Sequence, residues 1–291
     1  MSAITQHTKS GKARFDHVYN QPDPRGYFRV LQGLDYRAPA HGARVFPQLV
    51  ARQRERLNRE DLVVLDLCCS YGVNAALLNH DLTLDALYER YCSPHLDSLS
   101  AQELVVADQA FYSDCRRPSP VQVVGIDVAE HALSYAKRVG LHAGGSSENL
   151  ERKDPNRALR RVLATVDLIT ITGGVSYISA RTFNRVLAHA PARSVPWVAA
   201  FVLRWSQYSS IAKALASYGL KTEKLVGRTF PQRQFTGDSE RDYVLTELEK
   251  IGVDPEGKEA EGWYHAEFYL SRPADQIRSL PLEKILEGCM S

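Results

Sequence analysis

The sequence predicts an α/β protein built on a doubly wound, mostly parallel sheet. Apolar runs of strand length recur along the chain, at 62–69 (LVVLDLCC), 121–128 (VQVVGIDV), 166–174 (VDLITITGG) and 197–204 (WVAAFVLR). Segments with helical spacing lie between them, at 129–140, 155–166 and 180–190. Strands without polar alternation are typical of a sheet that helices cover on both faces.

The segments before this core predict a tail and a cap. Residues 1–14 are polar, and we expect a disordered tail there. Residues 15–58 are aromatic and basic, with helical spacing in their second half, which indicates an N-terminal helical cap.

The core itself is predicted to span 59–273. A helical insertion is expected at about 80–117, because two helix-like stretches lie where one crossover helix would suffice. Further helices are predicted at 208–219 and 242–252, an antiparallel edge strand at 262–270, and a short surface helix at 274–291.

Composition excludes several classes of function. The 291 residues carry a formal net charge of +2, which gives no electrostatic reason to expect nucleic acid or an anionic membrane as a partner. No apolar run reaches the roughly 18 residues of a membrane span, and the N-terminus lacks the apolar core of a secretory signal. The five cysteines form no spaced disulfide framework, so a reduced, cytoplasmic protein is expected. A homodimer is compatible with this composition and net charge.

The loop after the first predicted strand is the first candidate binding site. In a doubly wound sheet, ligands bind at the carboxyl ends of the strands, where the strand order reverses. The loop reads Asp66-Leu67-Cys68-Cys69-Ser70-Tyr71-Gly72. Close approach of backbone N–H groups to a ligand, together with a tight turn, requires small residues here. The alternative is a buried strand followed by an ordinary turn.

This loop resembles the first motif of the class I S-adenosylmethionine-dependent methyltransferases. That motif is an acid, an apolar residue, and three glycines at alternate positions. Asp66 matches the acid and Gly72 the last glycine, whereas Cys68 and Ser70 replace the first two glycines. The resemblance implies a seven-stranded, Rossmann-like methyltransferase fold. It also implies that Asp66, Cys68, Cys69, Ser70 and Gly72 hold the methionine end of S-adenosylmethionine, with no metal.

Asp127, at the end of the second strand, fits a ribose site. A carboxylate accepts hydrogen bonds from both ribose hydroxyls, and Val128 is placed to pack against adenine. Asp127 alternatively caps the following helix. It lies far beyond the roughly 20 residues usual after a dinucleotide glycine loop, and no G-x-G-x-x-G occurs, so the pattern disfavours a nicotinamide cofactor.

Three further segments supply candidate residues. Asn149 is predicted to read the adenine edge with Leu150 beside it, although an ordinary loop explains the same residues. Gly173 allows close backbone approach, and Ser176 and Tyr177 are expected to face the reaction. A tyrosine face near the sulfonium contributes about 1–2 kcal/mol when desolvated, but Tyr177 as a packing aromatic is the alternative. Trp205 is expected on the other wall, and Tyr19 is expected to contact the cofactor from the cap.

Neither a metal centre nor a hydrolase is predicted. Cys68 and Cys69 are adjacent, so their side chains point apart, and no Cys or His pair completes a tetrahedral site. No G-x-S-x-G motif occurs.

The predicted activity is methyl transfer to a small-molecule acceptor of secondary metabolism. The strand ends carry no His, Asp or Lys placed as a general base, so the acceptor is expected to be already nucleophilic, such as an amine, an enolate or an amino-acid-like metabolite. The altered glycine loop and aromatic strand ends also resemble the bacterial azetidine-2-carboxylate synthases, which implies self-cyclisation of S-adenosylmethionine as an alternative. A non-catalytic nucleoside-binding partner protein is a third.

Overall fold

The computed structural model describes residues 6–7, 13–191 and 194–288. Of the predicted disordered tail, residues 1–5 and 8–12 lie outside the described residues. The remainder pairs as two short antiparallel strands, β1 (Gln6–His7) and β2 (Ala13–Arg14).

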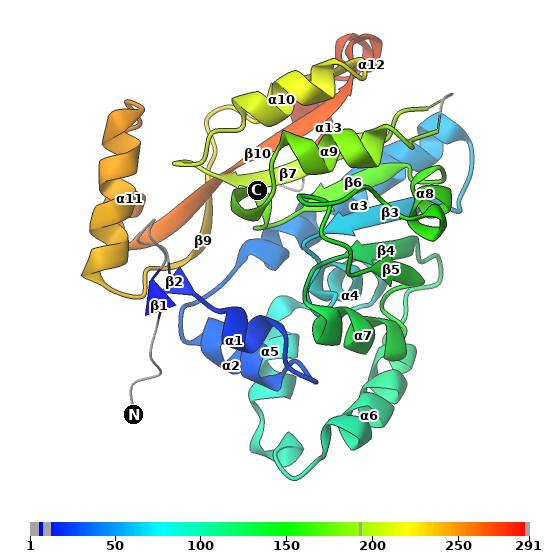
Figure 1. The fold of residues 1–291 in the computed structure, drawn as a ribbon, viewed down its shortest axis with the longest axis vertical. Coiled ribbons are helices and arrows are strands. Elements are labelled where there is room, and N and C mark those ends of the chain that lie inside the picture. Colours follow the sequence, from blue (N-terminus) through cyan, green and yellow to red (C-terminus); the bar gives the residue numbers. More distant parts are fainter. Residues whose placement is uncertain (1–5, 8–12, 192–193, 289–291) are drawn as a thin grey trace.

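One large sheet forms the centre of the molecule (Figure 1). Its parallel strands are β3 (Val63–Leu67), β4 (Gln122–Ile126), β5 (Gly144–Ser146), β6 (Leu168–Ile171) and β7 (Trp197–Leu203). The long strand β10 (Trp263–Pro273) pairs antiparallel with β7. On its other side, β10 pairs antiparallel with β8 (Leu220–Lys224) and β9 (Phe230–Gln234).

The strand order is β5-β4-β3-β6-β7-β10-β8, with β9 alongside β10. It confirms the predicted doubly wound, mostly parallel sheet. The segment predicted as an antiparallel edge strand is antiparallel, but it lies inside the sheet. β8 and β9 take the edge instead.

Helices cover both faces of the sheet, which explains the continuous apolar strands. Alternate side chains of β3 enter two separate cores, Val64 on one face and Leu65 on the other. The first core packs against α3 (Ala38–Leu57), α4 (Val73–Asn79) and α7 (Glu130–Arg138). The second packs against α8 (Arg157–Leu163), α9 (Ala180–Leu187) and α10 (Ser209–Ala216).

The predicted cap divides between two roles. Helix α3 covers the sheet, whereas α1 (Asp16–Tyr19) and α2 (Arg25–Gln32) lie beside the carboxyl ends of the strands, where α2 packs against α5 (Leu84–Cys92). The insertion between β3 and β4 contains α5, a 3₁₀ turn (Pro94–Leu96) and α6 (Ala101–Asp114).

A buried hydroxyl network ties the insertion to the sheet-covering helix α7. The Tyr91 hydroxyl lies 2.8 Å from that of Tyr112 and 2.9 Å from that of Tyr135. Tyr135 donates to the Asp108 carboxylate, which Arg90 also contacts at 2.7 Å. Because all of these polar groups are satisfied, the insertion is held in a defined position.

The C-terminal third adds helices outside the sheet. They are α11 (Asp238–Lys250), α12 (Ala274–Ser279) and α13 (Leu282–Ile285), with a 3₁₀ turn at Glu259–Glu261. Two short helices thus occupy the described part of the segment predicted as one helix at 274–291, whose residues 289–291 lie outside the described residues. Among the described helices, none combines the length and the apolar composition needed to cross a bilayer.

Candidate active site

A cavity of about 690 Å³ opens at the carboxyl ends of β3, β4 and β6. From β3 the chain proceeds to β4 and β5 on one side and then returns to β6 and β7 on the other, so the strand order reverses beside β3. This is where a doubly wound sheet binds its ligands, and the volume is that of a small-molecule site.

The loop after β3 adopts left-handed backbone at alternate positions. The φ angles are +57° at Cys68, +47° at Ser70 and +80° at Gly72. These are the three positions at which the methyltransferase motif has glycine. A non-glycine residue in this conformation costs roughly 1–2 kcal/mol, so the loop keeps the glycine-type backbone against the preference of two of its residues.

Two glycines, one in β4 and one after β6, make room for the cysteines. A Cβ atom on Gly174, which follows β6, would lie 2.3 Å from the Cβ of Cys68. A Cβ atom on Gly125, in β4, would lie 2.5 Å from the Sγ of Cys69. Each cysteine side chain of the loop therefore faces a glycine, whose lack of a Cβ atom leaves space for it. Burial raises the pKa of both thiols, so they remain protonated and unreactive at neutral pH.

Asp127 joins the end of β4 to this loop. Its carboxylate accepts hydrogen bonds from the backbone N–H of Ser70 and of Ala129, each at 2.8 Å. Burial raises the pKa of Asp127, and the two N–H donors oppose that rise. Asp127 is not the N-cap of α7, which is Ala129 without a side-chain cap; its bond to the Ala129 N–H forms a tight turn that precedes the helix. A carboxylate accepts about four hydrogen bonds, so it retains capacity for a ligand. Val128 is 64% exposed at the rim of the cavity.

Asp66 lies beneath the cavity rather than in its wall. It is fully buried, and it accepts hydrogen bonds from Asn74 at 3.0 Å and from Thr170 at 2.9 Å. Asn74 also donates to Thr172 at 2.9 Å, and both residues line the cavity. Burial raises the pKa of Asp66 to about 7. Gly72 is likewise outside the wall, because it is the N-cap residue of α4.

Asn149 and Leu150 line the cavity after β5. The Asn149 side-chain oxygen accepts a hydrogen bond from the Glu151 backbone N–H at 2.9 Å, which forms a tight local turn. Asn149 thus has the local role that the ordinary-loop alternative describes. This turn uses only its side-chain oxygen and leaves the amide N–H groups of Asn149 to other partners. Leu150 is buried.

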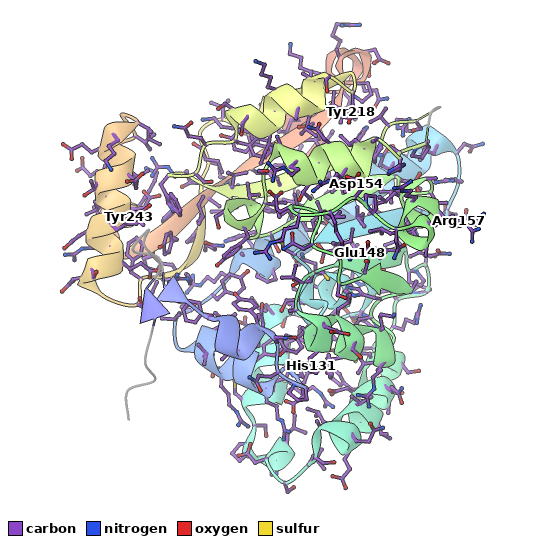
Figure 2. The ribbon with its side chains drawn as sticks, viewed as in Figure 1. His131, Glu148, Asp154, Arg157, Tyr218 and Tyr243 are labelled. Atoms are coloured by element: carbon purple, nitrogen blue, oxygen red, sulfur yellow. The ribbon has the colours of Figure 1, made fainter. Side chains whose placement is uncertain are left out.

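The predicted residues after β6 and β7 fall in different places. Gly173 and Tyr177 line the cavity, whereas Ser176, in the 3₁₀ turn Val175–Tyr177, does not. Trp205 does not line it either. Its ring packs 6.0 Å from that of Tyr243 in a separate core beside α11. Figure 2 shows Tyr243 on α11, well away from Glu148 at the cavity wall.

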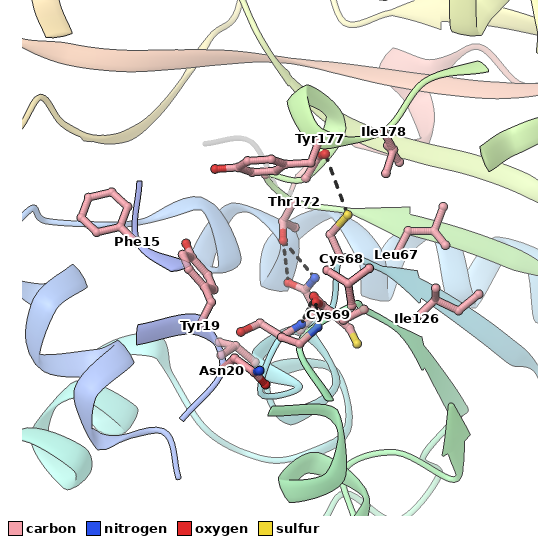
Figure 3. Close-up of a pocket in the computed structure, with 18 of the residues that line it drawn as sticks. Phe15, Tyr19, Asn20, Leu67, Cys68, Cys69, Ile126, Thr172, Tyr177 and Ile178 are labelled. Carbon is pink, nitrogen blue, oxygen red and sulfur yellow. Dashed lines mark hydrogen bonds between the residues drawn. The ribbon is translucent and has the colours of Figure 1, made fainter. Parts of the chain in front are cut away.

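One end of the cavity is aromatic, and only part of it was predicted, namely Tyr19 and Tyr177. Figure 3 shows Phe15, Tyr19 and Tyr177 at this end, with Leu67, Ile126 and Ile178 at the other. Four further residues line this end and were not predicted from the sequence: Phe15, Tyr36, Gln232 and Arg233. The aromatic richness of 15–36 was a usable signal, but the short strand β9 that carries Gln232 and Arg233 has no apolar pattern.

No protein-family model and no curated protein matches the chain. Solved structures do resemble it. The plantazolicin methyltransferase BpumL in complex with SAH is 10% identical, with 89% of this chain and 95% of that chain covered and a TM-score of 0.41. Magnesium protoporphyrin IX methyltransferase from Synechocystis, with bound SAM, is 11% identical over 79% and 80%, with a TM-score of 0.36. A putative sarcosine dimethylglycine methyltransferase from Galdieria sulphuraria is 14% identical over 79% and 86%, with a TM-score of 0.37. These likenesses are too distant to assign an activity.

The part of the chain that the structure describes contains no group of three or more His, Cys, Asp or Glu side chains arranged to hold a metal ion.

Proposed function

We propose that this protein binds S-adenosylmethionine and transfers its methyl group to a small-molecule acceptor. The observation that carries this proposal is the left-handed loop at Cys68, Ser70 and Gly72, joined through the Ser70 N–H to the Asp127 carboxylate. This hydrogen bond joins the tight backbone turn to a carboxylate that would accept hydrogen bonds from a ribose. No pyrophosphate-binding glycine pattern is present, which favours a nucleoside ligand without phosphate.

The cavity residues fit the parts of this ligand. Asp127 would accept hydrogen bonds from the ribose hydroxyls, and Val128 and Leu150 would pack against adenine. The loop at 68–70, with Asn74 and Thr172 behind it, would hold the amino-acid tail. The face of the Tyr177 ring, which lines the cavity, would stabilise the positive charge of the sulfonium.

The chemistry demands little beyond alignment. When bound, S-adenosylmethionine supplies an electrophilic methyl group on a sulfonium. The chain contributes orientation and exclusion of water, since its aromatic residues and buried loop surround the position of transfer. The cavity volume of about 690 Å³ favours a small acceptor.

Incubation with S-adenosylmethionine, followed by mass spectrometry, tests the proposal. Formation of S-adenosylhomocysteine together with a methylated acceptor, and only when an acceptor is added, is the expected result. Methylthioadenosine with an azetidine amino acid, formed without any acceptor, would establish self-cyclisation instead. Tight binding with neither product would indicate a nucleoside-binding partner protein.

Substitution of Asp127 tests the binding site itself. Asp127→Ala should weaken S-adenosylmethionine binding by about 1–3 kcal/mol, the scale for hydrogen bonds to a charged group. Isothermal titration calorimetry measures this, with Asp114→Ala on the exposed end of α6 as the matched control. Equal affinities in the two variants would remove Asp127 from the site.

A further inference from the structure

The aromatic end of the cavity is built from two segments that are far apart in the sequence. The turn between α2 and α3 is hydrogen-bonded to the edge strand β9: the Gln234 N–H donates to the Leu34 carbonyl at 2.8 Å, and the Arg37 N–H donates to the Gln232 carbonyl at 2.7 Å. These two bonds flank Tyr36. They place the tyrosine beside Gln232 and Arg233.

Three hydrogen-bond donors at this end have no protein acceptor among the described residues. The Tyr36 hydroxyl and the Gln232 amide nitrogen both face Gly173, since a Cβ atom there would lie 3.2 Å from the first and 3.0 Å from the second. The third donor is the Nε–H of Arg233, which also lines the cavity. None of the three is a buried donor cut off from the cavity, so each can donate to a ligand that enters it.

Arg233 is held rigidly, which suits a fixed donor. Its Nη1 and Nη2 groups contact the Glu240 carboxylate at 3.0 and 2.7 Å, and both side chains are more than 90% buried. Its guanidinium lies 4.6 Å from the ring centre of Tyr264 and 5.3 Å from that of Phe15. Bidentate pairing and stacking fix the orientation of the guanidinium, and its Nε–H is one of the two N–H groups that these bonds leave over.

The acidic residues that line the cavity lie elsewhere and are already engaged. They are Asp127, Glu148 and Glu151. Glu148 accepts from Ser146 at 2.9 Å, and Glu151 accepts from Thr182 at 2.6 Å. The buried Asp66 is bonded to Asn74 and Thr170. A cationic acceptor at the aromatic end would therefore meet a guanidinium and no free carboxylate among the described lining residues.

We propose that Tyr36, Gln232 and Arg233 form a subsite for an anionic oxygen, so that the methyl acceptor is a planar phenol or enol bound in its ionised form. The aromatic side chains at this end fit a planar body, and the Tyr36 hydroxyl and the Gln232 amide nitrogen, both beside Gly173, are donors that would stabilise an oxyanion with Arg233 supplying positive charge. This assignment rests on the proposed methyl transfer.

Ionised binding explains why the cavity carries no general base at this position. The nucleophilic atom of the anion forms its bond to the methyl carbon, the methyl carbon–sulfur bond breaks, and sulfur keeps the electron pair. An anion and a sulfonium thus become two neutral products, and no proton moves in the step. The acceptor loses its proton to water before or during binding, assisted by the three donors.

The test uses three related nitrobenzenes, of which only one ionises near neutral pH. They are 4-nitrophenol, whose ionised form absorbs visible light, 4-nitroaniline and 4-nitroanisole, each titrated into the full-length protein saturated with S-adenosylhomocysteine. We expect 4-nitrophenol to bind most tightly and its visible absorbance to persist to lower pH than in free solution. The same titrations without the adenosyl compound, and separate calorimetry of S-adenosylhomocysteine, distinguish failure of this subsite from failure of the proposed function.

The double variant Tyr36→Phe, Gln232→Met removes two donors and keeps side-chain volume. It should weaken 4-nitrophenol binding at least about tenfold, the effect of lost hydrogen bonds to a charged group, and leave 4-nitroanisole unchanged. Tyr243→Phe on α11 is the control, and an unaltered thermal midpoint shows that the double variant folds. Failure of 4-nitrophenol to bind, equal binding of 4-nitroaniline, or equal 4-nitrophenol affinity in the double variant overturns the assignment.

Discussion

The contact between Cys68 and Gly174 gives the sharpest test of how the cofactor loop is built. Gly174 has φ −89° and ψ −9°, a backbone conformation that alanine adopts without strain. The only obstacle to alanine is steric, because its Cβ would lie 2.3 Å from the Cβ and 2.5 Å from the Sγ of Cys68. Real carbon atoms without a bond between them are separated by about 3.5 Å or more.

The expected cost follows from this overlap. Gly174→Ala should lower the free energy of unfolding by about 1–3 kcal/mol, the range for overpacking in a well-packed core, since the Cβ of Cys68 is fixed to the backbone and no rotamer relieves the clash. Cys68→Gly removes both clashing atoms and also the left-handed strain. The double variant should therefore be more stable than the sum of the single changes predicts, with a coupling energy of about 0.5–3 kcal/mol.

Urea unfolding followed by circular dichroism measures this double-mutant cycle. Cys68→Ala is the discriminating control: it removes Sγ but keeps Cβ, so it should leave most of the destabilisation caused by Gly174→Ala. Additivity within about 0.5 kcal/mol, or full rescue by Cys68→Ala, would refute the packing that we describe.

Three other predictions concern the same region. Ser70→Gly should raise the free energy of unfolding by roughly 1 kcal/mol, because it relieves the strain of φ +47° and removes a buried hydroxyl without a partner in the described structure. Ser70→Ala keeps the backbone strain and should therefore gain less. Equal stabilities of the two variants in urea unfolding would contradict this. Tyr71→Phe should increase the rate of amide hydrogen exchange in residues 18–21. The reason is that the Tyr71 hydroxyl accepts from the Gln21 N–H at 2.8 Å and donates to the carbonyls of Val18 and Gln21. Unchanged exchange, measured by mass spectrometry, would show that this contact does not hold the segment. The raised pKa of Asp66, about 7 when folded, means that the folded state binds the proton more tightly, so stability should fall as pH rises from about 4 to about 7. Urea unfolding at pH 5 and pH 8 measures this difference in the free energy of unfolding. The difference should be at least about 1 kcal/mol smaller in Asp66→Asn than in the unaltered protein, and identical pH profiles would argue against a buried, protonatable carboxyl.

The local elements of the fold were predictable because their signals are local. Each apolar run became a strand of the sheet, and the helical segments between them became α7, α8 and α9. β5, β8 and β9 were missed, since Gly144–Ser146, Leu220–Lys224 and Phe230–Gln234 carry no run of β-branched residues and no sustained apolar alternation. Their pairing is imposed by the neighbouring strands.

The strand ends and the small residues that follow them can be read from the chain alone, because a strand, a turn and an acid at a strand end are encoded within a few residues. The sequence therefore indicated the loop at 66–72, Asp127 and the carboxyl edge of the sheet. Only the tertiary structure decided that Tyr36 meets Gln232 and that Trp205 packs against Tyr243 rather than facing the cavity. The first outcome depends on a contact between residues nearly 200 positions apart, and the second depends on how the C-terminal elements pack beside the sheet. No local pattern in the sequence carries that information.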